Sequence, residues 1–300
     1  MVFMLTRCSN VRARGGIVRS VRIGALALVL SACSPRGGSS PIVEVPLDVP
    51  RLDAGSSTTH ASAAGVRFGR VVPAPSTRWH VDVSAKSASA DAPGGTQLSE
   101  YVSSYIVEVL ATNGAAPSRV RLVFEKNVQQ YQGIDKATAI DGKTYVVDAS
   151  TSDGASGRWA VRDARGAVPS EEEIERVLDV VPDLGTRTQV DQILPDAAMA
   201  IGDARDELAG AILRVIHPRA WTLNKGTAVL ARTEADDAVF TIAIDATGTN
   251  GVRMVVSGEA RVRLRDARLV QMAFDGTYDR VGGSAADPGT FTLRRTVRDL

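Results

Sequence analysis

Apolar and polar residues alternate along the first half of the chain. From Tyr101 to Ala111 the odd-numbered positions share one face, while Ile106 and Leu110 lie on the other. A period of two is typical of a β-strand with one face in a core and one in water. Asn113-Gly114 then marks a tight turn. The pattern predicts an antiparallel meander whose strands cover residues 79–84, 101–111, 119–124, 143–148 and 158–162.

The same alternation returns in the last third of the chain. Phe240, Ile242 and Ile244 share one strand face. A second meander is predicted, with turns at 250–251 and 266–268. Its strands cover residues 227–232, 239–245, 252–256, 260–265, 269–274 and 290–297.

Two helices are predicted between the meanders. Ser170 and Glu173 form a capping-box pattern, apolar residues follow at helical spacing, and Pro182 ends the helix. A second helix is expected over residues 203–216, with Pro218 as its stop. Leu194-Pro195-Asp196 is interpreted as an irregular connection between them.

This order of elements predicts an α+β fold that is antiparallel and rich in β-structure. One globular domain is expected over residues 65–300, with a β half at 65–165, a two-helix segment at 170–218 and a β half at 226–300. The two curved meander halves would form an open-barrel-like body with the helices over its open side. Two packed subdomains are the alternative.

The N-terminal region has a different pattern. Five arginines precede an apolar run of eight residues, Ile23 to Leu30, which is far shorter than the roughly 20 residues of a membrane-spanning helix. Leu30-Ser31-Ala32-Cys33 follows and resembles the lipobox of bacterial lipoproteins. The resemblance implies a signal peptide at 1–32 and a lipid on Cys33. A start at Met4 or later would leave the mature protein unchanged. An ordinary signal peptide with an incidental cysteine is the alternative.

Several expectations follow from this resemblance. Residues 33–64 have the composition of a flexible tether, and the lipid on Cys33 would hold the protein to a membrane of the cell envelope. Ser34 follows Cys33, at the position where an Asp tends to retain lipoproteins in the inner membrane. The absence of Asp there favours the outer membrane in a bacterium with two membranes. Loss of the five arginines would change the formal charge from +1 to −4, which argues against nucleic acid as a partner. Cys8 would leave with the signal peptide, so no disulfide could form.

The body resembles an uncharacterised group of β-rich bacterial lipoproteins. The residues that carry the resemblance are the strand at 106–110, Leu194-Pro195-Asp196, Ile201-Gly202-Asp203 and the strands after Gly226. Arg205 stands where that group has Trp. The strand pattern is also similar to the open β-barrel of lipoprotein carriers, which implies a lipid-binding body.

The sequence contains no recognisable catalytic or cofactor motif. None of His60, His80 and His217 has a partner at metal-ligand spacing, and no Gly-x-Ser-x-Gly segment occurs. The acidic clusters at 171–173 and 234–237 lack the pattern of a calcium loop. We therefore expect no metal and no cofactor.

One surface feature is a candidate contact site. Arg261, Arg263 and Arg265 lie on one side of a predicted strand, where they could meet phosphate groups of lipid or lipopolysaccharide. A solvated strand face with acidic partners on the neighbouring strands is the favoured interpretation.

These observations predict a non-enzymatic lipoprotein of the cell envelope that binds a partner protein or a hydrophobic ligand. A structural accessory of an outer-membrane complex is the first alternative. An envelope hydrolase with an unrecognised site is the second.

Overall fold

The computed structural model describes residues 65–89, 97–152, 159–216, 221–249, 251–280 and 289–300. The predicted signal peptide, the lipobox with Cys33, the tether, His60 and His217 lie outside these residues. Strands dominate: β1 (Arg78–Ser89), β2 (Gln97–Thr112), β3 (Pro117–Tyr131), β4 (Ile134–Ala137), β5 (Thr144–Ser152), β6 (Trp159–Asp163), β7 (Trp221–Glu234), β8 (Asp237–Gly248), β9 (Val252–Arg263), β10 (Leu269–Arg280) and β11 (Gly289–Asp299).

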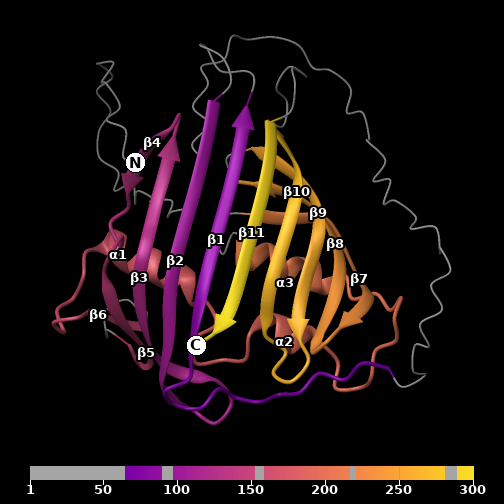
Figure 1. The fold of residues 1–300 in the computed structure, drawn as a ribbon, viewed down its shortest axis with the longest axis horizontal. Coiled ribbons are helices and arrows are strands. Elements are labelled where there is room, and N and C mark those ends of the chain that lie inside the picture. Colours follow the sequence, from indigo (N-terminus) through magenta and orange to yellow (C-terminus); the bar gives the residue numbers. More distant parts are fainter. Residues whose placement is uncertain (1–64, 90–96, 153–158, 217–220, 250, 281–288) are drawn as a thin grey trace, which may run out of the picture.

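All eleven strands belong to one antiparallel sheet in the order β6-β5-β3-β2-β1-β11-β10-β9-β8-β7, with β4 on β3. The two predicted meanders are its two halves, and β1 joins them by pairing with β11 from Trp79↔Asp299 to Ala88↔Thr290. The sheet is open, because its end strands β6 and β7 do not pair. Figure 1 shows it curving around the helices, which lie on one of its faces.

Three helices, rather than the predicted two, connect the halves: α1 (Glu171–Val180), α2 (Gln189–Ile193) and α3 (Glu207–Ile216). The predicted capping box at α1 is confirmed, because Ser170 accepts from the backbone of Glu173 and the Glu173 carboxylate accepts from the backbone of Ser170. Thr188 caps the short α2, which was not predicted and ends directly before the predicted irregular connection at Leu194-Pro195-Asp196.

The strands differ from the predicted ones at two further places. The segments 252–256 and 260–265 form one strand, β9, which ends at Arg263. Gly258 lies between the two segments, and a Cβ there would overlap the carbonyl of Ala273 on β10, so the glycine allows close pairing inside the ladder. The short, exposed β4 was not predicted, because it has no buried face to produce a pattern.

Two apolar clusters lie on the face of the sheet that carries the helices. The larger joins β7–β11 to α2 and α3 and includes Phe240, Phe274 and Ile212. The smaller joins β2, β3 and β5 to α1 and includes Phe124 and Tyr145. Among the partly buried residues, Val83 on β1 packs against both clusters, so the line between them follows the central strands.

Candidate ligand-binding cavity

A cavity of about 620 Å³ lies between the central strands and the helical segment. Its walls come from β1, β2, β10 and β11 on one side, and from residues 179–191 and the end of α3 on the other. Most of the side chains that face it are apolar: Trp79, Val81, Val83, Ala85, Val107, Val180, Val181, Val215, Ile216, Met254, Leu269, Met272, Phe291, Leu293 and Val297.

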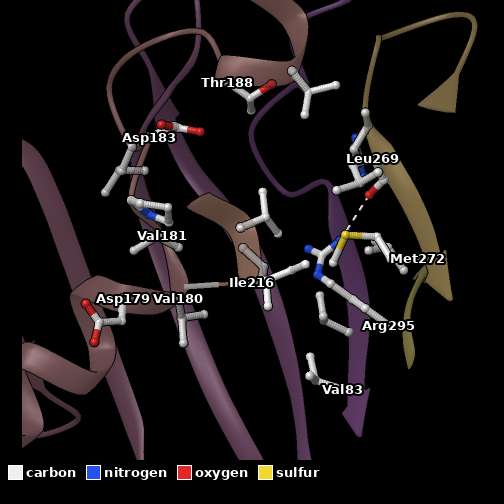
Figure 2. Close-up of a pocket in the computed structure, with 18 of the residues that line it drawn as sticks. Val83, Asp179, Val180, Val181, Asp183, Thr188, Ile216, Leu269, Met272 and Arg295 are labelled. Carbon is white, nitrogen blue, oxygen red and sulfur yellow. Dashed lines mark hydrogen bonds between the residues drawn. The ribbon is translucent and has the colours of Figure 1, made fainter. Parts of the chain in front are cut away.

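The cavity exists because the helices do not cover the whole sheet. Helix α3 packs on β7 and β8. Helix α1 packs with the cluster of β3 and β5. The lining opposite β1 and β11 comes instead from the connection between α1 and α2, which includes Val181, Leu184 and Thr188. Figure 2 shows Val181, Thr188 and Ile216 around the space, with Val83 and Met272 on the side of the sheet.

The segment before β1 runs past one end of the cavity. Gly69 donates to the carbonyl of Leu264 at 2.6 Å, and a Cβ at Gly69 would overlap the carbonyl of Arg265. Arg70 fixes the other side of this segment by donating to the carbonyl of Leu194 at 2.8 Å and pairing with Asp191 at 2.8 Å. Val71, Val72 and Pro73 also line the cavity, so the segment forms part of its wall.

Most polar groups around the cavity have partners within the protein. Asn127, which is 1% exposed, donates to the Tyr101 hydroxyl and to Ser103 at 2.8 Å each, and accepts from Thr138. Arg268 lies 4.4 Å from the centre of the Trp79 ring and pairs with Asp266 at 3.1 Å. These groups stabilise the walls.

Arg295 is different. It lies on the cavity side of β11, where its Nη1 donates to the carbonyl of Leu269 at 3.1 Å. Within the described part of the chain its guanidinium forms no ion pair. Burial raises the pKa of the neighbouring Tyr105, and the charge of Arg295 partly opposes that rise. Figure 2 shows the guanidinium reaching into the space beside Met272 and Ile216.

The arginine stripe predicted from the sequence, Arg261, Arg263 and Arg265, is not part of the cavity lining, and all its members have acidic partners. Arg261 pairs with Glu234 at 2.6 Å, and Arg265 pairs with Asp299 at 2.6 Å. Arg263 pairs with Asp299 and also with Asp266, at 2.8 Å. Charge on this surface is therefore balanced within the protein, and contact with an external anion stays a prediction.

A polar cluster on β1 and β2 has the connectivity of a serine hydrolase. Ser104 Oγ lies 3.0 Å from His80 Nε2, and His80 Nδ1 lies 3.2 Å from Asp82 Oδ2. The sequence analysis missed this arrangement because the residues meet only when β1 pairs with β2. Alternation along β1 places His80 and Asp82 on one face. It does not give the register between β1 and β2, which brings Ser104 beside them.

The surroundings of this cluster do not favour catalysis. Glu125 Oε2 lies 2.9 Å from the same His80 nitrogen, and Ser104 also donates to Asp82 at 3.0 Å. Neither described cavity includes these residues. Ser104 lies inside the paired ladder of β2, so the geometry offers no turn of free N–H groups to stabilise an oxyanion.

The described ranges contain neither a metal-binding cluster nor a membrane-spanning helix. No group of three or more His, Cys, Asp or Glu side chains there could hold a metal ion. None of the described helices has the length and apolar character needed to cross a membrane.

No protein-family model and no curated protein matches the chain. Among solved structures, one from work on lipid–protein interactions in lipovitellin has 8% identity and a TM-score of 0.39, covering 76% of this chain and 25% of that one. A LolA superfamily protein from Nitrosomonas europaea has 8% identity and a TM-score of 0.20, covering 78% and 88%. The chain thus spans about a quarter of the lipovitellin chain, and these values are too low to assign it to either family.

Proposed function

We propose that this protein is a non-enzymatic binding protein that holds a hydrophobic ligand between its sheet and its helices. The observation that carries the proposal is the cavity of about 620 Å³ with its mainly apolar lining. Small-molecule sites typically measure about 300–1,000 Å³ and combine apolar walls with a few polar groups. The cavity has both properties.

The lining favours an apolar occupant over water. Water in a cavity needs two to four polar partners, and most polar groups around this one are already bonded to each other. An acyl chain in the same space would bury apolar surface, and each buried CH₂ group contributes about 0.8 kcal/mol. The cavity is therefore suited to a ligand with a long hydrocarbon part.

The experiment compares wild type with Val83→Phe, using the full chain and the neutral fluorescent probe N-phenyl-1-naphthylamine. Val83 lines the cavity on β1, and a phenyl group there would occupy ligand space. We expect at least a tenfold loss of affinity, equivalent to about 1.4 kcal/mol. Ser84→Phe is the matched control, because Ser84 is the next residue on β1 and is not in the lining. No binding by wild type, or equal losses in both variants, would contradict the proposal.

We also propose that the protein is anchored to the cell envelope by a lipid on Cys33, with the outer membrane favoured by Ser34. The support is the short apolar run followed by Leu30-Ser31-Ala32-Cys33. Metabolic labelling with a fatty acid should mark wild type but not Cys33→Ala. Equal label in both would contradict the anchor without affecting the cavity proposal.

A hydrolase is the second candidate, because Ser104, His80 and Asp82 lie in hydrogen-bonding order. The open setting of the cluster and the competing contact from Glu125 favour a structural role instead. Hydrolysis of p-nitrophenyl esters by purified wild type and Ser104→Ala distinguishes the two. We expect wild type and Ser104→Ala to hydrolyse the esters at the same background rate. Activity in wild type that is lost in Ser104→Ala would establish an enzyme.

A further inference from the structure

We propose that the ligand is a monoanionic amphiphile, a long acyl chain ending in a carboxylate, and that Arg295 binds the carboxylate. This inference rests on the proposed function and adds the chemical class of the ligand. The observation behind it is the position of Arg295 in a largely apolar wall. Among the residues the structure describes, this cation has no carboxylate partner.

The position of Arg295 follows from the alternation of β11. Phe291 and Leu293 point to the core and are 3% and 4% exposed, and Arg295 is the next residue in the same series. Across the ladders it pairs with Val83 on β1 and Met272 on β10, which also line the cavity. The backbone of Arg295 is therefore paired on both sides, and its guanidinium is positioned by the bond to the Leu269 carbonyl.

The neighbouring arginines of β11 are neutralised on the opposite face. Arg294 pairs with Asp275 at 2.8 Å, and Arg298 pairs with Asp82 at 2.7 Å. Within the described ranges, the polar groups at Arg295 are the Leu269 carbonyl, which accepts its hydrogen bond, and the nearby hydroxyl of Tyr105. A cation in apolar surroundings is unfavourable unless an anion compensates it. A ligand that brings one negative charge would supply that compensation.

The chemistry of the site selects a carboxylate. An arginine presents parallel N–H donors that match the two oxygens of a carboxylate. Tyr105 lies close by, and because burial raises the pKa of its phenol, the hydroxyl keeps its proton and can donate a second contact. A dianionic phosphate would leave one negative charge uncompensated, and a neutral ester would leave the arginine unpaired.

A purely structural role is the alternative. The Leu269 carbonyl lies where the register of β10 with β9 shifts between Leu269 and Gln271, and Arg295 bonds to that irregular position. If stabilising this bulge were its whole function, replacing Arg295 would lower stability and weaken all ligands equally. Selectivity between charged and neutral ligands therefore separates the two roles.

The test uses two probes with the same chain, cis-parinaric acid and its methyl ester, titrated into the full chain at neutral pH. A charge-assisted hydrogen bond contributes about 1.5–3 kcal/mol, so wild type should bind the acid roughly 10- to 150-fold more tightly than the ester. Arg295→Met should lose this preference and keep its affinity for the ester. Arg295→Lys should retain part of it, because it keeps the charge without the paired donors.

Arg294→Met is the matched control, since it removes an arginine from the next position of the same strand on the outer face. It should keep the preference of wild type. Equal binding of acid and ester by wild type would overturn the inference while leaving the cavity proposal intact, and this comparison needs no variant to fold. Equal weakening of both probes in Arg295→Met would assign the residue a structural role. Binding of neither probe by wild type would overturn the proposed function itself.

Discussion

The two halves of the sheet are covered by helices of different character. In the second half, α3 buries six of its ten residues against β7 and β8: Leu208, Ala209, Ala211, Ile212, Leu213 and Ile216. In the first half, α1 has the same length and buries only Val177 and Leu178. Apolar packing therefore holds the second half far more than the first.

The contacts beneath the two helices show why. A Cβ at Gly226 on β7 would lie 2.6 Å from the Cβ of Ala209, so the glycine lets α3 approach the strand closely. Helix α1 is instead fixed through Glu173, whose Oε1 accepts from Lys143 at 2.9 Å and from Tyr145 at 2.7 Å. A helix attached by polar contacts near its N-terminus leaves part of the central strands uncovered, and the cavity lies against these strands.

The largest expected effect comes from a matched pair of core substitutions. Leu208 on α3 is fully buried, and Leu208→Ala should lower the free energy of unfolding by about 3–5 kcal/mol. Leu178 on α1 is 9% exposed, and Leu178→Ala should cost only about 2 kcal/mol, because fewer neighbours surround it. Denaturant unfolding of the full chain measures both. Equal losses would contradict the difference between the halves.

A smaller effect tests the polar attachment of α1. Burial alone would raise the pKa of Glu173, but hydrogen bonds from Ser170, Lys143 and Tyr145 outweigh it and lower the pKa from 4.5 to about 2. Its stabilising contribution is therefore complete above pH 4.5 and is lost as the pH falls toward 2. Glu173→Gln should lower stability at pH 7 by about 1 kcal/mol and should weaken the pH dependence between these values.

Glu172→Gln provides the control for this measurement. Glu172 is 57% exposed and pairs with Arg176, at 3.2 Å, on the same helix, so its loss should change stability by a few tenths of a kcal/mol. If both variants showed the same pH dependence as wild type, Glu173 would not be the contact that fixes α1.

The smallest effect is expected at the exposed end of β11, on the line where the halves meet. Asp299 at the end of β11 pairs with Arg263, Arg265 and Arg268. Because Asp299 is 39% exposed and solvent screens these pairs, Asp299→Asn should lower stability by about 1 kcal/mol or less at low salt. The difference from wild type should shrink at high salt. A loss as large as that of Leu208→Ala would show that charge, not packing, joins the halves.

Local structure was predictable from the sequence wherever one face of an element is buried. The alternation of β2 and the capping box of α1 were read correctly, because each depends on neighbouring residues. The pairing of β1 with β11 was not predicted, because no local pattern encodes contact between strands at opposite ends of the domain. The same reason explains why the Ser104, His80 and Asp82 cluster was missed.

The cavity could not be read from the sequence either. Val83 and Leu293 have the apolar character of ordinary core residues, and only the placement of short helices leaves space beside them. Arg295 did carry a signal. Arg295 is the one charged residue in the run of alternate positions Phe291, Leu293, Arg295 and Val297. The arginine stripe predicted as a contact site was instead Arg261, Arg263 and Arg265.

The pairing of β1 with β11 has a consequence for how the protein is made. Trp79 and Asp299 are partners in one ladder although more than 200 residues separate them along the chain. Contacts this distant in sequence slow folding, because a long loop must close before they form. Until β11 has been synthesised, β1 and β10 each present an unpaired edge that invites aggregation. The cavity wall that contains Arg295 also needs β11, so the cavity is incomplete until this strand has been made.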